Sequence, residues 1–544
     1  MIKVVTAEQM GKIDRLTTER FGVPSIELME NAATAVVDVI LQELDGSFEG
    51  KSAVVLCGTG NNGGDGAAIA RLIKAAGGEV FPLLLGKVEN TKGDARVNFD
   101  RLIDECRFAR EDIEVSNQDE INEFWLSRRS SKNKLGLIVD AVFGTGLHRP
   151  VKGIFELFLD SAIDYFHEIS PPPLMVSVDL PSGIDSDRAT PIGYNFDPQV
   201  TVTFTSPKLA NVLPPAANEQ GKLIVKEIGS PQELIDETTS LTFLAEAQDV
   251  RDWMSSTAFS SDSYKKSRGS VLIAAGSKKY SGAAVLSANG AMRSGAGIVT
   301  AAVPRSAFSA VAERVLPEVM VREVSDTEVG TFGVNSYGGI EDLVRGSHTV
   351  LVGCGIAMEN GVTEFVQTLI ARRLQPLVID ADGLNAISPI SVEGIEEAPL
   401  ILTPHIGEFK RLAGIENEIS DDKRVEVLRG FAVDNQVICV LKGERTLIAS
   451  PEGVVVVNPT GNPGLGKAGN GDNLAGIISG FVAQTVVARD SMSGNDVEEE
   501  VFGAVVAAVY VAGLAGDIAA EKFGNRVMTA SDVRECLTDA FRSI

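Results

Sequence analysis

The stretch SAVVLCGTGNNGGDGAAIARLIKAAGGEVFPLLLG, residues 52–86, decides the fold class of the first half of the chain. The apolar run SAVVLC predicts a buried strand, AAIARLIKAAG predicts a helix, and EVFPLLLG predicts a second strand. A strand, a glycine-rich loop, a helix and another strand in this order make a βαβ unit. We therefore expect a parallel α/β sheet in this half.

The loop of this unit satisfies the pattern G-x-G-x-x-G at residues 58–63. In a dinucleotide-binding unit, the second strand ends in an acidic residue that holds the ribose, but here it ends in PLLLGK. The pattern alone is therefore weak evidence. The loop still predicts a phosphate site, because four glycines allow positive φ and close backbone approach: Gly60, Gly63, Gly64 and Gly66. The helix dipole would favour a charged Asp65 there. The alternative is a tight turn without a ligand.

Two further strands of the first half end in aspartate. LGLIVD ends at Asp140, and LMVSVD ends at Asp179 and runs into LPSG. Because ligands lie outside the carboxyl ends of parallel strands, we expect one oxygen-rich pocket, suited to a hard cation and to proton transfer. Its expected members are Asn61, Asn62, Asp65, Asp140, Asp179 and Ser182. For any one of the aspartates, the alternative is a capping or turn role.

The second half repeats the alternation of strands and helices. Six apolar runs end in glycine or a polar residue, which predicts a second parallel sheet: GSVLIAAGS, AGIVTAAV, HTVLVGCG, PLVIDADG, LILTPHIGE and QVICVLKG. The polar, acidic segment of residues 230–250 separates the halves, so we place the boundary near 230–245. AGNGD (468–472) before an apolar helix predicts an anion hole with a carboxylate beside it. Lys442 at a strand end suits a phosphate contact, although a surface lysine is the alternative.

The composition excludes several classes of protein. The 544 residues carry a formal net charge of −25, so we expect neither a nucleic-acid nor a membrane partner. Five cysteines without a C-x-x-C pattern predict no disulfide framework and no zinc site. The first residues lack the apolar core of a signal peptide, and the uncharged run 501–516 is short for a membrane span and predicts a buried helix. We expect a reducing, cytoplasmic location.

Several motifs carry a resemblance to a known family. The first half has the order and spacing of NAD(P)H-hydrate epimerases in LMENA, CGTGNNGGDG, VDAVFGTGL, VDLPSG and TFTSPK. The second half resembles ATP- or ADP-dependent NAD(P)H-hydrate dehydratases in GSKKYSGAAVLSANGAMRSGAGIVT, DADGLNAI, TPHIGEFKRL, VLKGERT and GNPGLGKAGNGDNLAG. The chain thus resembles the fused repair enzymes over nearly its whole length. This implies a Rossmann-like three-layer α/β/α domain over 1–232 and a ribokinase-like α/β domain over 240–544.

The resemblance assigns roles in the first half. Asp179 would be the acid and base at C6 of the nicotinamide. A potassium ion would be held by Asn62, Asp140 and Ser182. The substrate would be bound by two loops, one contacting its phosphates and sugar with Asn61, Asn62, Gly63, Gly64 and Asp65, and a second made of Gly144, Thr145, Gly146, Leu147, His148, Arg149 and Pro150.

In the second half, the resemblance implies that Asp472 is the catalytic carboxylate. ADP or ATP, with Mg²⁺, would be bound by Lys442, Gly443, Glu444, Arg445, Thr446 and Gly471. The substrate site would be lined by Ala283, Gly355 and His405, although His405 also fits a purely structural role. The chain departs from the family pattern with GCGIA at 353–357 instead of GPGLG, with SYKK at 263–266, and at Asn470, Asn473 and Ala512.

The resemblance implies a two-step repair of damaged cofactors. The first half would interconvert the R and S forms of C6-hydrated NADH or NADPH, and the second would dehydrate the S form with consumption of ADP or ATP. We also expect a homo-oligomer. Two alternatives stay open: a ribokinase-like kinase for a small alcohol with an accessory first half, and a non-catalytic nucleotide-binding module. A kinase would leave a stable phosphoester, whereas a dehydratase releases phosphate and reduced cofactor.

Overall fold

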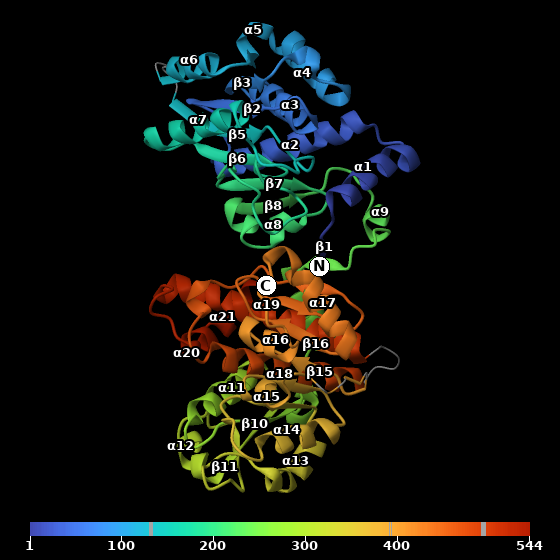
Figure 1. Ribbon diagram of the computed structural model, residues 1–544, viewed down its shortest axis with the longest axis vertical. Helices are drawn as coiled ribbons and strands as arrows, with labels where there is room; N and C mark the ends of the chain where they lie inside the picture. The colour runs from blue at the N-terminus through green and yellow to red at the C-terminus, as the bar shows by residue number, and fades with distance from the viewer. Residues whose placement is uncertain (130–133, 391, 393, 396, 491–496) are drawn as a thin grey trace. The chain divides into compact units, whose positions relative to one another are not determined.

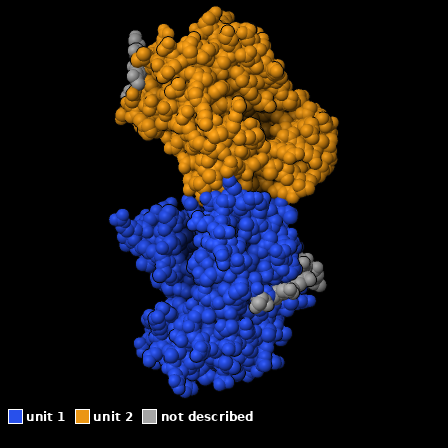
Figure 2. Space-filling model, in the orientation of Figure 1, with its two compact units in different colours: residues 1, 241–544 blue, residues 2–240 orange. Residues whose placement is uncertain are grey.

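The computed structural model describes residues 1–129, 134–390, 392, 394–395, 397–490 and 497–544. Within this part of the chain, residues 2–240 form one compact unit, and residues 241–544 with Met1 form another (Figure 2). Each unit contains a sheet (Figure 1) and has its own hydrophobic core. The division falls inside the acidic segment of residues 230–250.

The N-terminal unit contains a seven-stranded sheet in the order β4-β3-β2-β5-β6-β7-β8, and its neighbouring strands are parallel. The order reverses at β2, because β3 pairs with one side of it and β5 with the other. The strands are β2 (Lys51–Cys57), β3 (Glu79–Leu85), β4 (Glu114–Val115), β5 (Lys134–Ala141), β6 (Leu174–Val178), β7 (Val200–Phe204) and β8 (Lys222–Lys226).

Helices cover both faces of this sheet (Figure 1). Alternate residues of β2 face opposite sides: Val55 packs in one core cluster with α2, α3 and α4, and Val54 in another with α6 and α7. The unit is therefore a three-layer α/β/α sandwich. Its helices are α1 (Ala7–Phe21), α2 (Ser25–Glu43), α3 (Asn61–Ala75), α4 (Gly93–Cys106), α5 (Arg110–Ile113), α6 (Gln118–Arg129), α7 (Ile154–Glu168), α8 (Leu209–Val212) and α9 (Gln232–Asp236).

The first helix, α1, follows a short strand, β1 (Ile2–Lys3). Thr6 Oγ1 accepts a hydrogen bond from the Gln9 backbone, and the Gln9 side chain accepts one from the Thr6 backbone. This capping box satisfies two N–H groups that the helix leaves free. The helix ends at Gly22, which has a φ of 73°, the left-handed conformation that glycine adopts at low cost.

The C-terminal unit has a mixed sheet whose strands run in the order β9-β18-β17-β16-β15-β14-β13-β10-β11-β12. The pairs β16–β17 and β17–β18 are antiparallel and the others are parallel. The strands are β9 (Thr242–Leu244), β10 (Ser270–Ala274), β11 (Ile298–Pro304), β12 (Met320–Val324), β13 (Thr349–Val352), β14 (Leu377–Ile379), β15 (Leu400–Leu402), β16 (Ile438–Leu441), β17 (Leu447–Ala449) and β18 (Val455–Val457).

One large core cluster of this unit joins the sheet to α10, α11, α18 and α19. The helices are α10 (Ala247–Ser256), α11 (Ser281–Arg293), α12 (Phe308–Ala312), α13 (Glu341–Arg345), α14 (Val362–Ala371), α15 (Asp382–Ala386), α16 (Ile406–Leu412), α17 (Arg424–Asn435), α18 (Asn470–Asp490), α19 (Val497–Phe523), α20 (Ala530–Glu535) and α21 (Leu537–Ser543).

Helix α19 contains the uncharged run 501–516. This helix has 27 residues. In the part of the chain that the structure describes, it is the one helix whose length and apolar composition would allow it to cross a membrane. However, 72% of its most apolar window is buried inside the protein. It is therefore the core helix that the sequence predicts.

Two candidate active sites

The N-terminal unit has a pocket of about 580 Å³ at the carboxyl ends of β2 and β5, where the strand order reverses. Open α/β sheets bind ligands at such a switch point. Two loops line it, residues 58–62 after β2 and residues 142–147 after β5. Helices α1 and α2 add Met10, Asp14 and Met29, and the ends of β6 and β7 add Asp179 and Lys208.

The glycines of the first loop do not adopt the predicted positive φ. Gly60 has a φ of −89° and caps α3, while Gly63, Gly64 and Gly66 lie inside this helix. They are needed because the helix packs tightly: a Cβ on Gly63 would lie 1.7 Å from the Gly58 carbonyl oxygen, and one on Gly64 would lie 2.6 Å from Ala95 Cα. These glycines therefore serve close packing, and the first residues of α3, Asn61 and Asn62, line the pocket.

Asp179 forms a buried ion pair with Lys208 just beyond β6. Lys208 Nζ donates to Asp179 Oδ1 at 2.6 Å, and Thr203 Oγ1 donates to the same oxygen at 3.0 Å. The Lys208 side chain is only 1% exposed. Asp179 has a φ of 66°, a strained backbone conformation that aspartate tolerates better than most residues and that is common at functional sites. The pair therefore fixes one carboxylate in the pocket wall.

Two more carboxyls belong to the same pocket. Burial raises the pKa of Asp14 to about 6, opposed by the charge of Lys208 and assisted by that of Asp179. Burial also raises the pKa of Asp65 well above its usual value, and the charges of Asp179 and Asp14 add to this. The sequence predicts a charged Asp65 stabilised by the helix dipole, but desolvation outweighs the dipole one turn inside α3.

The three expected potassium ligands lie together around the backbone of Phe143. Asp140 is fully buried and accepts hydrogen bonds from Ser182 Oγ at 2.6 Å, the Ser182 backbone at 2.8 Å and Ser177 Oγ at 2.9 Å. Asn62 Nδ2 donates to the Phe143 carbonyl at 2.8 Å, and the Phe143 N–H donates to Ser182 Oγ at 2.9 Å. Despite these bonds, burial raises the pKa of Asp140. A cation beside it would offset that cost.

The structure brings together most of the predicted residues of the first half. The pocket is lined by Asn61, Asn62, Asp65, Gly144, Thr145, Gly146, Leu147 and Asp179. Gly63 and Gly64 are buried behind the lining, as are Asp140 and Ser182. The sequence predicts one oxygen-rich pocket, but in the structure some of these oxygen groups line the pocket and others are buried behind its wall. His148, Arg149 and Pro150 are exposed and lie outside the lining.

Sequence reasoning missed Lys208 and Asp14 as members of this site. Lys208 closes the motif TFTSPK, and a lysine that follows an apolar strand is a signal of a strand-end position. Asp14 lies in the middle of α1, where no motif singles it out. Only the packing of α1 beside the pocket identifies it.

The C-terminal unit has a similar switch point, because β10 pairs with β11 on one side and β13 on the other. Gly276 N donates to the Cys354 carbonyl at 2.8 Å, which joins the loops after β10 and β13. Gly355 has a φ of 65°, and a Cβ there would lie 2.7 Å from Ala283 Cβ. The predicted substrate residues Ala283 and Gly355 are thus in contact at this point.

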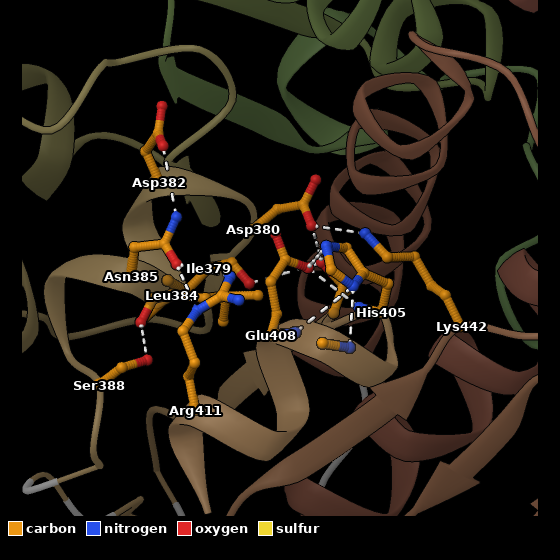
Figure 3. A network of polar contacts seen from close by, with 12 residues as sticks. Ile379, Asp380, Asp382, Leu384, Asn385, Ser388, His405, Glu408, Arg411 and Lys442 are labelled. Atoms are coloured by element: carbon orange, nitrogen blue, oxygen red, sulfur yellow. Dashed lines mark hydrogen bonds and ion pairs between the residues drawn. The ribbon is translucent and has the colours of Figure 1, made fainter. Parts of the chain in front are cut away.

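A second buried ion pair lies close by, between Lys442 and Asp380 (Figure 3). Lys442 Nζ donates to Asp380 Oδ1 at 2.8 Å, and Thr403 Oγ1 donates to the same oxygen at 2.8 Å. Lys442 is 20% exposed, so it is not the surface lysine of the alternative interpretation. A Cβ on Gly471 would lie 3.4 Å from Lys442 Nζ, which places the start of α18 beside the pair.

Asp472 lies next to Gly471 in the first turn of α18. Burial raises its pKa to about 6, and the charge of Asp380 adds to this, while a hydrogen bond from Cys354 and the charge of Lys442 oppose it. Cys354 Sγ lies 3.7 Å from Asp380 Oδ2. Ligand atoms of Cys354, Asp380 and Asp472 lie within 4.8 Å of one another. Sequence reasoning assigned no role to Asp380 or Cys354, although both lie in the quoted runs PLVIDADG and HTVLVGCG.

His405 has the structural role that the sequence left open. It is the N-cap of α16, and its Nδ1 accepts hydrogen bonds from Gly407 N at 3.0 Å and Glu408 N at 3.4 Å. Figure 3 shows it between Lys442 and Glu408. Its side chain is 57% exposed, so a ligand can still reach the ring.

The loop KGERT joins β16 to β17 at a hairpin. Lys442 points to Asp380, while Arg445 donates to the Pro459 carbonyl at 2.6 Å and burial lowers its pKa. Thr446 Oγ1 donates to the Gly443 carbonyl at 3.4 Å, and Glu444 is exposed. The loop is thus held in shape before a nucleotide binds.

Two departures from the family pattern leave buried polar atoms near this site. Asn470 Nδ2 donates to the Leu465 carbonyl at 3.0 Å, but Asn470 Oδ1 has no hydrogen-bond partner among the described residues. Asn473 Oδ1 is also buried without one, and it packs against Gly290 of α11. Unsatisfied buried groups are costly, so both departures from the family pattern carry a cost in stability at the start of α18.

Comparisons with known proteins agree with this geometry. The family described as NAD(P)H-hydrate dehydratase matches residues 271–539, and the YjeF-related protein N-terminus matches residues 25–210. A bifunctional NAD(P)H-hydrate repair enzyme of Moorella thermoacetica is 34% identical over 99% of this chain and 97% of its own length. The chain belongs to the bifunctional NAD(P)H-hydrate repair enzymes. Another member, from Thermofilum pendens, is 33% identical over 100% of this chain and 97% of its own length.

Two solved structures are similar to about half of this chain. An ADP/ATP-dependent NAD(P)H-hydrate dehydratase from Bacillus subtilis, co-crystallised with ATP and Mg²⁺, is 28% identical, with a TM-score of 0.45 over 54% of this chain and 96% of that chain. A ribokinase-like protein from Enterococcus faecalis is 24% identical, with a TM-score of 0.46 over 56% of this chain and 97% of that chain. The predicted α/β class with two domains is confirmed.

Proposed function

We propose that this chain repairs hydrated nicotinamide nucleotides in two steps. Residues 2–240 interconvert the R and S forms of C6-hydrated NADH or NADPH, and residues 241–544 dehydrate the S form with consumption of ADP or ATP. Membership of the bifunctional family supports both activities. The observation that carries the proposal is that each unit holds a buried aspartate–lysine pair at or near its switch point, with a second carboxyl of raised pKa beside it.

In the epimerase pocket, Asp179 is the proton-transfer group at C6 of the nicotinamide. Lys208 fixes its position, since both the lysine and Thr203 donate to one carboxylate oxygen. The other oxygen is left for the substrate. The N–H groups at the start of α3, beside Asn61 and Asn62, bind the phosphates. The loop 144–147 completes the substrate site from the other wall.

The residues near Phe143 fit a potassium ion. The set offers the Asn62 amide, the buried carboxylate of Asp140, the Ser182 hydroxyl and the Phe143 carbonyl. The hydrogen bonds to Asp140 come from hydroxyl and backbone N–H groups, which are neutral donors. When bound, the ion would neutralise Asp140 and hold the loop after β5 in place. We therefore expect epimerisation, and not dehydration, to depend on potassium.

In the dehydratase site, Asp472 takes the proton from the C6 hydroxyl as that oxygen attacks the terminal phosphoryl group of the nucleotide. The loop 442–446 and Gly471 hold the nucleotide, and the N–H groups at the start of α18 stabilise the phosphoryl charge. Ala283, Gly355 and His405 line the substrate side. Mg²⁺ would be held beside the carboxylates of Asp380 and Asp472 and would supply further charge neutralisation.

The proposal also covers the location, partners and oligomeric state of the protein. A net charge of −25 and five free cysteines support a cytoplasmic enzyme without nucleic-acid or membrane partners. A homo-oligomer stays a prediction.

The test mixes purified protein with hydrated NADH and either ADP or ATP, and follows the absorbance of reduced nicotinamide. Recovery of that absorbance with release of phosphate supports the proposal. A stable phosphoester without recovery would instead identify a small-alcohol kinase. No recovery with either nucleotide would show that the dehydratase assignment is wrong.

A further inference from the structure

Asp14 lines the epimerase pocket without any assigned role. It is contributed by α1, whereas Asp179 and Lys208 come from the ends of β6 and β7. Its Oδ1 is buried and accepts no hydrogen bond from the described residues, in contrast to Asp179 Oδ1, which accepts two. A buried carboxyl oxygen left free in a substrate pocket is available to the ligand.

Burial, and then the charges of its neighbours, set the protonation of Asp14. The titratable groups that it faces are Lys208 and Asp179, and Asp65 of α3 interacts with it in turn. Asp179 and Asp14 therefore share one ammonium group. Asp179 takes the direct ion pair, and burial raises the pKa of Asp14 to about 6. A group with a pKa near neutrality can both give and accept a proton during turnover.

We propose that Asp14 is a second catalytic residue of the epimerase, which transfers a proton at C6 together with Asp179; this rests on the proposed epimerase function. Inversion at C6 requires a hydroxyl to leave one face and a water to add to the other. Two carboxyls contributed by different elements of one pocket provide one proton-transfer group for each face.

The proposed steps balance without an oxidant or reductant. The C6–O bond breaks as one carboxyl gives its proton to the departing hydroxyl, which leaves as water, while the N1 lone pair forms a C6=N1 double bond. Water then adds to the opposite face of C6, N1 regains its lone pair, and the other carboxylate takes the proton from the added water. One proton has moved from one carboxyl to the other, and exchange with solvent restores the starting form.

The experiment uses the full-length chain and a mixture of R and S hydrated NADH with excess nucleotide. The dehydratase half consumes the S form in a fast phase, and the following phase reports R-to-S conversion. Asp14→Asn should slow the second phase by about 10²-fold or more and leave the fast phase unchanged. Asp14→Glu should recover part of the rate. Glu19→Gln is the matched control, because Glu19 is an exposed carboxylate of the same helix.

Three readouts separate this role from a structural one. KM for the R form should change less than kcat, and the ionisation near pH 6 in the rate profile should disappear in Asp14→Asn. Trp125, buried in the N-terminal unit, reports its folding by fluorescence in a Trp253→Phe background. If Asp14→Asn fails to fold, the pH profile of Asp14→Glu decides: a shifted ionisation supports the proposal and an unchanged one overturns it.

The result that overturns the inference is a second phase of Asp14→Asn within twofold of wild type. If Asp179→Ala stalls that phase while Asp14→Asn does not, only the role of Asp14 is wrong. If wild type shows no catalysed R-to-S conversion at all, the proposed epimerase function itself is wrong.

Discussion

The two sites use the same three groups in different ways. Each has a lysine paired with an aspartate, Lys208 with Asp179 at 2.6 Å and Lys442 with Asp380 at 2.8 Å. Each has a further carboxyl whose pKa burial raises to about 6, Asp14 in one and Asp472 in the other. In the N-terminal unit the proposed catalytic aspartate is the paired one. In the C-terminal unit it is the unpaired one.

This difference suggests what each pair does. A lysine that is 1% exposed acts mainly on its aspartate, whereas one that is 20% exposed can also reach a phosphate. Lys208 therefore positions a proton-transfer group. Lys442 links the nucleotide loop to the carboxylates and leaves Asp472 free to titrate. Asp472 is the unpaired carboxyl of raised pKa that we propose for proton transfer in the C-terminal unit. Asp14 has the same features in the N-terminal unit, which is consistent with the role proposed for it.

The largest expected effect comes from removing the unpaired carboxyl of the dehydratase. Asp472→Asn should lower nucleotide-dependent repair by about 10²–10⁴, the range for loss of a general base, and leave nucleotide binding nearly unchanged. The folded pKa is raised, so the ionised form disfavours folding at pH 7, and the variant should be at least as stable as wild type. Turnover on the S form and calorimetric binding check this, with the exposed Asp434→Asn as control. Near-normal turnover would refute the role.

The next largest effect is expected from a substitution that breaks the buried ion pair of Lys208 with Asp179 in the epimerase pocket. Lys208→Met leaves the Asp179 charge without its partner and should cost about 3–5 kcal/mol in the free energy of unfolding, with loss of R-to-S conversion. Adding Asp179→Asn should restore most of the stability and none of the activity. Denaturant unfolding followed by Trp125 fluorescence measures this. Lys222→Met, which breaks the exposed pair with Glu43, should cost less than about 1 kcal/mol. Equal costs for the two variants would contradict a buried pair.

The smallest effect concerns a residue at which the chain departs from its family. The Cys354 thiol lies beside both Asp380 and Asp472, and its interaction with Asp472 lowers the pKa of that carboxyl against the larger effect of burial. Because Asp472 must be ionised to take a proton, dehydration should be lost as the pH falls through about 6. Cys354→Ala should move that loss to higher pH and change the rate at pH 8 by less than about threefold. Cys354→Ser, which keeps a donor, should resemble wild type. An unchanged profile in Cys354→Ala would contradict this interaction.

The fold was predictable because the apolar runs alternate regularly with helical patterns. SAVVLC and EVFPLLLG became β2 and β3, and all six runs of the second half contain strands, β10, β11 and β13 to β16. The antiparallel strands β17 and β18 have three residues each, too short for a periodic signal. Their pairing depends on the hairpin after β16, which sequence patterns alone do not reveal.

The sites were predictable where chemistry follows a strand end. Asp179 and Asn62 were placed at the carboxyl edge of the sheet in this way, and both line the pocket. Lys442 was placed at a strand end, and the structure puts it beside the start of α18. Asp14 was not found in this way, because a helix residue far from any motif joins a site only through tertiary packing. The glycines of α3 were assigned the wrong conformation, since the same residue type serves a turn with positive φ or a tightly packed helix.

The separate cores also set an order in time. Every residue that lines the epimerase pocket precedes residue 229, whereas the core of the second unit includes residues as late as Ala540. Domains generally fold as units during synthesis, at roughly 5–20 residues per second, so the first pocket can close roughly 15–60 seconds before the second core is complete. For that interval a nascent chain on the ribosome would be able to interconvert the two isomers before it could remove either of them.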